Sequence, residues 1–403
     1  MLLLALTLFA PQELPAPSDL PERSGLPAAL ELADGTPVRT NAQWQTRRAE
    51  LRRMFERYVY GEAPPTPRLE AHTRQRWLTL DGKATIEVID LSFAELPDEA
   101  PGIELLLVLP ARSNGPTPIF LGINKCGNHT VLDDPQIPDR GAWRAVANCG
   151  KGHGLRGSKQ DSWCIDLLVS RGYGLATFAC GDIDPDEDDR SNGIHPWYPD
   201  HDWGTLAAWA WGLSRAIDHL VTDARIDSDR ISAIGHSRRG KTALLAAAFD
   251  ERIALVVPHQ SGTGGCALSR ENDQETVARI TKVFPHWFSP TFAEFGNGQE
   301  ARLPVDQHLL VALVAPRLLI ETVGLQDLWA NYPSSLRGLR EASPVWSMLG
   351  APGLLGNGTL GPTDAIEAET VGHLLQYRLD TKHVLTADYW SAILDFADLH
   401  MTR

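Results

Sequence analysis

The chain has 403 residues, of which 43% are apolar, and it carries a formal net charge of −14. This length and composition allow one large α/β domain or two ordinary ones, and they exclude a disordered or collagen-like chain. The acidic balance contains no run of basic residues, so a nucleic-acid or anionic-membrane partner is not expected.

The N-terminus begins MLLLALTLFAP, in which an apolar run of about nine residues is too short to span a bilayer. The run resembles the core of a signal peptide but lacks the basic region that usually precedes one. The next stretch, PQELPAPSDLPERSGLP, is rich in proline, as leaders and linkers are. We therefore expect residues 1–40 to be a signal-like segment and leader, residues 41–403 to form a single domain, and the protein to be secreted or periplasmic.

The predicted elements change character along the chain. Residues 41–61 have apolar side chains near helical spacing and predict an amphipathic helix. Three strands, at Trp77–Leu80, Ala84–Phe93 and Ile103–Leu109, predict an antiparallel sheet edge. Strands and helices then alternate, which predicts a mostly parallel sheet flanked by helices. In this part we expect strands at Thr117–Ile123, Gly172–Ala179, Ile231–Ile234, Ala254–Pro258 and Arg317–Val323, and helices at Asp161–Ser170, Trp203–His219, Thr242–Phe249 and Asp388–His400.

Long connections leave the carboxyl ends of the predicted parallel strands, over residues 125–160, 181–202, 262–303 and 330–382. Open α/β sheets bind ligands at that edge, so we expect these connections to form the walls of a site. The connection from Asp182 to Asp202 is dense in carboxylates. Because it lacks the spaced register of a calcium loop with its closing Glu, we expect a solvated acidic loop there.

The stretch from Arg230 to Leu245, RISAIGHSRRGKTALL, predicts a strand, a sharp turn and a helix, with Ser237 at the turn. Such an elbow holds a serine hydroxyl out of the packing, near a base and near amide donors for an oxyanion. The usual G-x-S-x-G pattern is shifted, because the second glycine comes one residue late, at Gly240. A surface serine beside two solvated arginines is the alternative interpretation.

A nucleophilic Ser237 needs a histidine base and an acid. In α/β-hydrolases the chain order is Ser, acid, His, which leaves His373, His383 and His400 as candidate bases. His383 lies in a polar segment before the last predicted helix and is favoured, with His373 as the competitor. For the acid, Asp327 follows a late strand, whereas Glu321 lies inside that strand and is assigned to the structure. A turn-capping role for Asp327 is the alternative.

Other residues near the elbow are candidates for binding. The backbone amide of Arg238 is a predicted oxyanion donor, and a second donor is expected at Cys126 or Gly127, in the loop after a predicted strand. Lys241 lies on the same helix face as Ser237 and can reach a ligand hydroxyl or carboxylate, unless it is a solvated surface charge. Trp329 offers a flat apolar face for a sugar ring, unless it is a core aromatic.

The five cysteines, Cys126, Cys149, Cys164, Cys180 and Cys266, show neither a CxxC pair nor zinc-ligand spacing with histidine, so no structural metal is expected. Cys149 and Cys164 flank a glycine-rich loop. They could form a disulfide in an oxidising compartment, which the sequence leaves open.

These motifs resemble the bacterial branch of the glucuronoyl esterases, carbohydrate esterase family fifteen. The resemblance runs from about Asn41 to the C-terminus and rests on GHSRRGKTAL, DERIALVVPHQSGTGG, GINKCGNHT, RGYGLATFACGDIDPD, WGTLAAWAWGLSRAIDHL, FPHWF, QDLWA and KHVLTADYW. It implies an α/β-hydrolase fold, no metal or cofactor, and a glucuronoxylan or lignin-carbohydrate substrate in which 4-O-methyl-glucuronic acid is esterified to a lignin alcohol. We expect a monomer.

The resemblance also implies residue roles. By motif, Ser237 is similar to the family's nucleophile, His383 to its base and Arg238 to the arginine that helps hold the oxyanion. Lys241 is similar to the lysine that binds the sugar hydroxyls, and Trp329 to the tryptophan over the uronate.

The chain departs from the family at the acid. Many members have Glu in the segment P-x-E-S-G, where this chain has Gln260, and an Asp two residues before the tryptophan, here Asp327, can serve instead. Residues 275–287 are expected to contain further sugar contacts, with His286 as a candidate, and Gln260 is a separate candidate for a substrate contact. An acetyl-xylan esterase with the same triad, or a non-catalytic uronate-binding descendant, are the alternatives.

Overall fold

The structure is a computed structural model, and it describes residues 14–139, 149, 154–270 and 272–401. Within these ranges the strands form a ten-stranded sheet in the order β1-β2-β3-β5-β4-β6-β7-β8-β10-β9. The strands are β1 Leu69–Thr79, β2 Ala84–Phe93, β3 Ile103–Pro110, β4 Thr117–Asn124, β5 Gly174–Ala179, β6 Ile226–His236, β7 Ile253–His259, β8 Leu318–Gly324, β9 Thr359–Leu360 and β10 Leu374–Leu379. The helices are α1 Asn41–Phe55, α2 Gln160–Trp163, α3 Ile165–Ser170, α4 Thr205–Leu220, α5 Arg238–Phe249, α6 Val277–Val283, α7 Gln307–Ala312, α8 Tyr332–Met348 and α9 Ala387–Met401.

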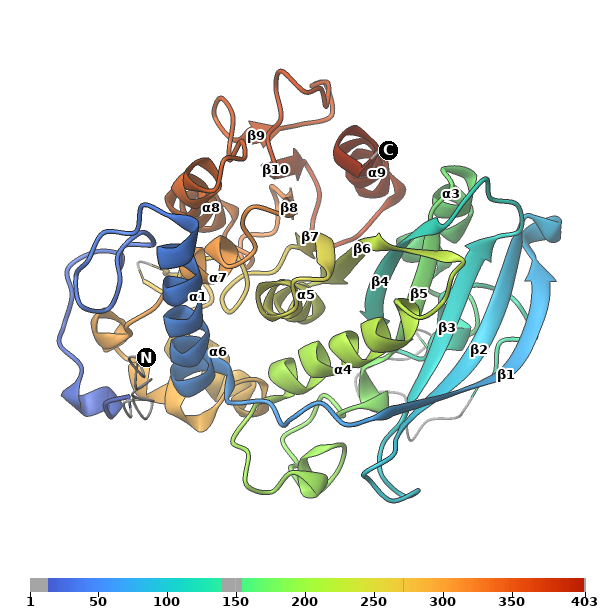
Figure 1. The fold of residues 1–403 in the computed structure, drawn as a ribbon, viewed down its shortest axis with the longest axis horizontal. Coiled ribbons are helices and arrows are strands. Elements are labelled where there is room, and N and C mark those ends of the chain that lie inside the picture. Colours follow the sequence, from blue (N-terminus) through green and yellow to red (C-terminus); the bar gives the residue numbers. More distant parts are fainter. Residues whose placement is uncertain (1–13, 140–148, 150–153, 271, 402–403) are drawn as a thin grey trace, which may run out of the picture.

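The sheet has an antiparallel edge and a parallel centre, as the sequence predicts. Strand β2 pairs antiparallel with β1 and β3, and β3 pairs antiparallel with β5. The strands from β5 through β4, β6, β7 and β8 to β10 run parallel. Figure 1 shows β1–β3 fanning out at one side of the molecule, away from the helices around β6–β8. The carboxyl ends of the parallel strands therefore meet at one edge, where the site lies.

Both faces of the sheet are covered. On β3, Leu105 and Leu107 join the core under α4 and α5, whereas Leu106 and Val108 join the core under α3 and α9. This alternation follows from the two-residue period of a strand, so a continuous apolar run is buried on both sides. The nucleophile strand β6 is thus held between two packed layers.

Three elements near the C-terminus were not predicted. The connection expected between residues 330 and 382 contains helix α8, with Pro344 inside it, the two-residue strand β9, and strand β10, which pairs parallel with β8 and β9. A proline inside a helical pattern lowers any sequence-based expectation of a helix, although the packing of α8 overrides it here. The predicted helix at Asp161–Ser170 is divided into α2 and α3 by Cys164, whose φ is 46°.

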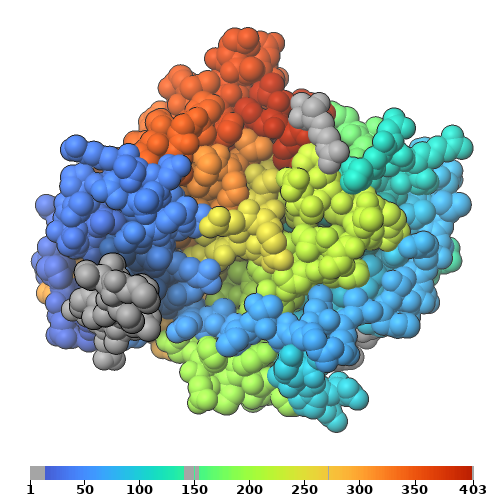
Figure 2. All heavy atoms as spheres, in the orientation of Figure 1, coloured from blue at the N-terminus to red at the C-terminus, as the bar shows by residue number. Residues whose placement is uncertain are grey.

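The segment from residue 14 to 40 is not a detached leader. Leu20, Ala29 and Val38 are buried in the core. The ring of His308 donates a hydrogen bond from Nε2 to the carbonyl oxygen of Pro27, with a distance of 2.7 Å. Figure 2 shows the N-terminal part of the chain, in blue, on one side of the molecule beside orange atoms of its C-terminal third. The proline-rich composition therefore marks an extended segment that packs on the domain, while the signal-like run lies outside the described residues.

Candidate active site

The predicted elbow is present between β6 and α5. Ser237 separates the two elements with φ 63° and ψ −127°, a conformation that side-chain-bearing residues seldom adopt. A Cβ on Gly235 would lie 1.9 Å from the carbonyl oxygen of Arg239. One on Gly240 would lie 2.9 Å from the carbonyl oxygens of Gly235 and His259. The close approach thus falls at position 240 and leaves position 239 free for an arginine, which explains the shifted glycine pattern.

His383 and Asp327 are in contact. His383 Nδ1 lies 2.6 Å from Asp327 Oδ2, and the other oxygen of Asp327 accepts the amide of Ala330 at 3.4 Å. Asp327 is buried in the turn after β8, and His383 follows β10. The ring of His383 also lies against that of His236, which directly precedes Ser237, with centroids 4.3 Å apart. Asp327 therefore acts as both the turn cap and the partner of the imidazole at the elbow.

Two residues, one at the end of β7 and one directly after it, hold the loop that carries His383 through hydrogen bonds. His259 bonds Thr322 Oγ1 at 2.7 Å and the carbonyl oxygen of Val384 at 2.8 Å through its two ring nitrogens. Gln260 donates to the carbonyl oxygen of Lys382 at 2.9 Å and bonds His236 at 3.2 Å. The Gln260 side chain is buried and its amide is engaged, so its predicted contact with substrate, which stays a prediction, would require one of these bonds to be exchanged. In the structure Gln260 helps to position the loop that carries His383.

The two histidines beside His383 are uncharged. Burial lowers the pKa of His259 to about 3, and burial also lowers the pKa of His236 well below its usual value. Both rings are therefore neutral at neutral pH. A positive charge that forms on His383 meets the carboxylate of Asp327 and no like charge from these neighbours.

The two competing histidines lie elsewhere. His373 directly precedes β10 and contacts the carbonyl oxygen of Pro316 at 2.9 Å, at the amino end of β8. His400 lies in α9, with its ring 5.3 Å from that of His373. Both are therefore at the edge of the sheet opposite Ser237, because β10 separates His373 from His383.

Arg238 is held by an acid that the sequence did not single out. Its guanidinium forms an ion pair with Asp186 and lies 4.3 Å from the centre of the Trp287 ring. His286 Nε2 lies 3.1 Å from the other oxygen of Asp186, and Trp287 donates its indole N–H to the same oxygen at 2.9 Å. Burial would raise the pKa of Asp186, but the hydrogen bond from His286 and the charge of Arg238 hold this pKa well below its usual range. His286 therefore orients Arg238 through Asp186.

The acidic loop is only partly solvated, which corrects the sequence expectation. Asp182, Asp184 and Asp186 are buried, whereas Glu187 to Asp189 are exposed. Asp184 accepts the hydroxyl of Thr205 at 2.6 Å. The buried carboxylates thus bond protein donors. Within the described ranges, no group of three or more His, Cys, Asp or Glu side chains is arranged to hold a metal ion.

Lys241, Glu275 and Trp329 form a buried network on the β7 and β8 side of the elbow. Lys241 Nζ donates to Glu275 Oε2 at 2.9 Å and to the carbonyl oxygens of Ser261 and Thr263, each at 2.6 Å. The Trp329 indole donates to Glu275 Oε1 at 2.7 Å. Burial lowers the pKa of Lys241. Since its three N–H groups all have protein acceptors, Lys241 reaches a sugar hydroxyl only if one of these bonds is exchanged.

Glu275 is the functional candidate that sequence reasoning placed only within a range. Both of its oxygens face the network, and Thr263 donates its amide to Oε2 at 2.8 Å. The stacking surface of Trp329 is shared, because the guanidinium of Arg279 lies 4.1 Å from its ring centre. The network therefore has one carboxylate, one ammonium and one indole in fixed mutual positions.

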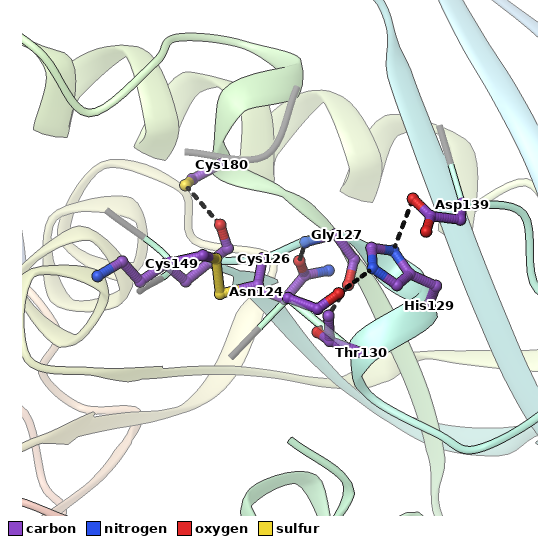
Figure 3. Close-up of a disulfide and its surroundings, with 10 residues drawn as sticks. Asn124, Cys126, Gly127, His129, Thr130, Asp139, Cys149 and Cys180 are labelled. Atoms are coloured by element: carbon purple, nitrogen blue, oxygen red, sulfur yellow. Dashed lines mark hydrogen bonds and ion pairs between the residues drawn. A yellow bond between two sulfur atoms is a disulfide. The ribbon is translucent and has the colours of Figure 1, made fainter. Parts of the chain in front are cut away.

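Figure 3 shows the loop after β4, from which a second oxyanion donor was expected. The Gly127 amide donates to Asn124 Oδ1 at 2.8 Å, so Gly127 is not free to serve as that donor. The Cys126 amide remains the candidate from this loop. Cys126 is joined to Cys149 in a disulfide, and Cys164 is a free thiol, so the possible Cys149–Cys164 bridge is wrong.

Comparisons with known proteins agree with one another. The family model described as glucuronyl esterase, fungi, matches residues 160–350. A carbohydrate esterase from an unknown prokaryotic organism is 40% identical over 392 residues, which cover 93% of this chain and 89% of that protein. A 4-O-methyl-glucuronoyl methylesterase of Cerrena unicolor is 29% identical over 337 residues, which cover 80% of this chain and 62% of that protein.

Solved structures match over nearly the whole chain. One is described as a promiscuous CE15 esterase from a marine bacterial metagenome, with a TM-score of 0.82, 37% identity, and coverage of 96% of this chain and 99% of that chain. Another is a glucuronoyl esterase from Solibacter usitatus, with a TM-score of 0.84, 35% identity, and coverage of 95% and 99%.

Proposed function

This chain belongs to carbohydrate esterase family 15, the glucuronoyl esterases, and on that premise we propose that it cleaves esters of glucuronic acid or its 4-O-methyl derivative through Ser237, His383 and Asp327. The chain is a carboxylic ester hydrolase with the α/β-hydrolase fold. The natural substrate that fits this activity is an ester that links glucuronoxylan to a lignin alcohol.

The observation that carries the proposal is the 2.6 Å contact between His383 and Asp327 beside the strained turn at Ser237. A carboxylate at Nδ1 fixes the tautomer of the imidazole and leaves Nε2 to accept a proton from a serine hydroxyl. The neutral rings of His236 and His259 add no charge that would oppose this step.

The reaction has two steps. Ser237 Oγ attacks the ester carbonyl carbon while His383 takes its proton. The backbone amides of Arg238 and Cys126 stabilise the oxyanion, with the Arg238 guanidinium nearby. The bond to the alcohol oxygen then breaks, and His383 returns the proton to this oxygen. In the second step, water attacks the acyl-enzyme with the same base and releases glucuronate and free Ser237.

The uronate ring is assigned to the network on the β7 and β8 side. Glu275 is a strong acceptor for sugar hydroxyls, and Trp329 supplies an apolar face for the ring. Lys241 holds Glu275 in place through a hydrogen bond of 2.9 Å. A rigid, buried set of this kind suits a part of the substrate that does not vary.

Hydrolysis of benzyl glucuronate and methyl glucuronate, measured beside p-nitrophenyl acetate, tests the proposal with wild type and Ser237→Ala in parallel. We expect serine-dependent activity with a preference for the glucuronate esters, and a folded, inactive variant. A preference for acetate would keep the triad and discard the substrate. Binding of glucuronate esters without turnover of any ester would point to a non-catalytic descendant.

A second candidate is a carbohydrate esterase of broader acyl specificity, such as an acetyl-xylan esterase. Its support is the neighbour described as a promiscuous esterase, which is 37% identical over nearly the full chain. Comparable specificity constants for acetyl-xylan and benzyl glucuronate would favour this candidate.

Export of the protein is also proposed. Its support is the Cys126–Cys149 disulfide, since disulfides form and persist in oxidising compartments. Among the described helices, none combines the length and the apolar composition that crossing a bilayer requires. Alkylation of the denatured protein without reductant should label Cys164, Cys180 and Cys266 alone, and labelling of Cys126 would contradict the proposal.

A further inference from the structure

A cavity of about 410 Å³ lies beside His383, on the side of the elbow where β4 ends. We call it the β4-side pocket. Its lining residues come from four segments. Among them are Lys125 after β4, Trp163 at the end of α2, Arg239 in the first turn of α5, and Leu385, two residues after His383. Residues of the Lys241 network do not occur among the described lining residues, so the pocket is separate from the site assigned to the uronate.

Two cations of the pocket lack counter-charges of their own. In the part of the chain that the structure describes, neither the guanidinium of Arg239 nor the ammonium of Lys125 has a hydrogen bond or an ion pair. The acid whose charge acts on both is Asp186, which is already engaged by Arg238 and His286. No Asp or Glu occurs among the described residues that line the pocket.

This arrangement favours an anion. Burial is the largest cause that lowers the pKa of Lys125, and repulsion by the charges of Arg239 and Arg238 lowers it further. The cations therefore repel one another in a partly desolvated pocket. The chain has 51 acidic and 37 basic residues, yet the acidic excess is absent from this pocket. A carboxylate placed between Arg239 and Lys125 would accept charge-assisted hydrogen bonds from both.

The opposite wall of the pocket is apolar. Trp163 lies over Gly122 of β4, where a Cβ would come within 3.2 Å of the tryptophan ring. Leu385 is partly buried, and Val384 is 41% exposed. A flat aromatic ring can pack against these side chains while a polar group at its far end reaches the cations.

The position of the pocket indicates which half of an ester it receives. An ester carbonyl at Ser237 has the uronate on one side and the alcohol on the other. Lys241, Glu275 and Trp329 lie toward β7 and β8, whereas the pocket lies toward β4. His383 lines the pocket, and the base must pass its proton to the alcohol oxygen.

We propose that the β4-side pocket binds the alcohol part of the ester and prefers an aromatic alcohol that carries a carboxylate, with the carboxylate at Arg239 and Lys125 and the ring against Trp163. This inference rests on the proposed function, because it assigns the second half of the same substrate.

The test compares two glucuronate esters that differ by one charge, the ester of benzyl alcohol and the ester of para-(hydroxymethyl)benzoate. In wild type, we expect kcat/KM to be about tenfold higher for the carboxylated ester, from charge-assisted bonds to two cations. In Arg239→Gln this ratio should fall close to one, and in Lys125→Gln it should fall in part. A wild-type ratio near one, or a ratio that neither variant changes, would overturn the proposal.

Arg279→Gln is the matched control, since it removes the same charge from the other side of the elbow, over Trp329. It should change kcat/KM for both esters by the same factor and leave their ratio unchanged. Loss of the ratio in this control would mean that the net charge of the protein, and not the pocket, sets the preference.

A binding measurement separates this proposal from the proposed function. Calorimetry of para-(hydroxymethyl)benzoate and of benzyl alcohol with wild type and Arg239→Gln requires no turnover. Tighter binding of the carboxylated alcohol to wild type by about tenfold, lost in the variant, supports the pocket even if neither ester is hydrolysed. Equal binding of the two alcohols contradicts the proposal even if both esters are good substrates.

Discussion

The two sides of the elbow differ in how their charges are balanced. On the β7 and β8 side, Lys241 and Glu275 are paired at 2.9 Å and every N–H of the ammonium has an acceptor. On the β4 side, Arg239 and Lys125 have no such bonds among the described residues. A network whose hydrogen bonds are all made has a fixed geometry before a ligand binds. The unpaired cations, in contrast, gain their counter-charge only when an anionic ligand binds. The difference suits an ester with a constant acid and a variable alcohol.

The sides also differ in how the backbone is held. The loop with His383 is tied to β7 by hydrogen bonds from His259 and Gln260 to backbone carbonyls. The loop after β4 is held by Asn124, which accepts the amide of Gly127, and by the Cys126–Cys149 disulfide. One loop is thus fixed by buried polar side chains and the other by a covalent bond, so different substitutions should loosen each.

The largest effect is expected from the acid. Asp327→Asn should lower kcat for benzyl glucuronate by about 10³- to 10⁴-fold, because an amide favours the wrong imidazole tautomer and does not stabilise the imidazolium. Gln260→Ala should cost much less, since Gln260 acts on the loop through the carbonyl of Lys382. The opposite order of these two losses would move the acid of the triad away from Asp327.

On the β7 and β8 side, removal of the Glu275 carboxylate should cost both stability and substrate binding. Glu275→Gln leaves the buried charge of Lys241 without a partner, which should lower the free energy of unfolding by about 4 kcal/mol and raise KM for glucuronate esters. Urea denaturation and steady-state kinetics measure the two effects. A Lys241→Met and Glu275→Met double variant should recover most of the stability but not the KM, and an unchanged stability in Glu275→Gln would show that the pair is dispensable.

On the β4 side, removal of the Cys126–Cys149 disulfide should lower the free energy of unfolding by less than Glu275→Gln does. The sequence separation of 23 residues between Cys126 and Cys149 predicts a loss of about 3 kcal/mol in Cys126→Ser, Cys149→Ser, from the freer unfolded chain. Chemical denaturation without reductant measures it. Cys164→Ser is the control, because this thiol is free, and an equal loss there would argue against a specific role of the bridge.

The smallest expected effect is on the pH dependence of the free energy of unfolding. His259 titrates near 6.5 when unfolded and near 3 when folded, so the unfolded state binds more protons between these values. Stability is therefore present above pH 6.5 and falls as the pH drops, by up to about 1.4 kcal/mol per pH unit from this group. His259→Asn should flatten the pH dependence of the free energy of unfolding between pH 6.5 and 4.5, and a slope that this variant leaves unchanged would contradict the assignment.

The elbow and its order of partners were predictable because they depend on local chain chemistry. Gly235 and Gly240 mark a close backbone approach, and a polar residue after a late strand marks Asp327. The sequence favours His383 over His373 because His383 lies in a polar segment before the last helix, and β10, which the sequence did not indicate, separates the two residues in the structure. Only the sheet shows that these residues lie at opposite edges.

The contacts that the sequence did not predict depend on the direction in which side chains point in the folded protein. Asp186 lies in a run of acidic residues, and composition does not tell which of them turns inward to meet Arg238. The amide of Gly127 was a reasonable oxyanion donor until Asn124 proved to accept it. Lys125 and Arg239 come from segments more than a hundred residues apart, so their pocket exists only in the folded chain.

A structure of Ser237→Ala with benzyl glucuronate tests the division of the ester between the two sides most directly. We predict the uronate ring beside Glu275 and Trp329, the ester carbonyl at the elbow, and the benzyl ring against Trp163 in the β4-side pocket. A uronate in the β4-side pocket, or a benzyl ring stacked on Trp329, would contradict this division.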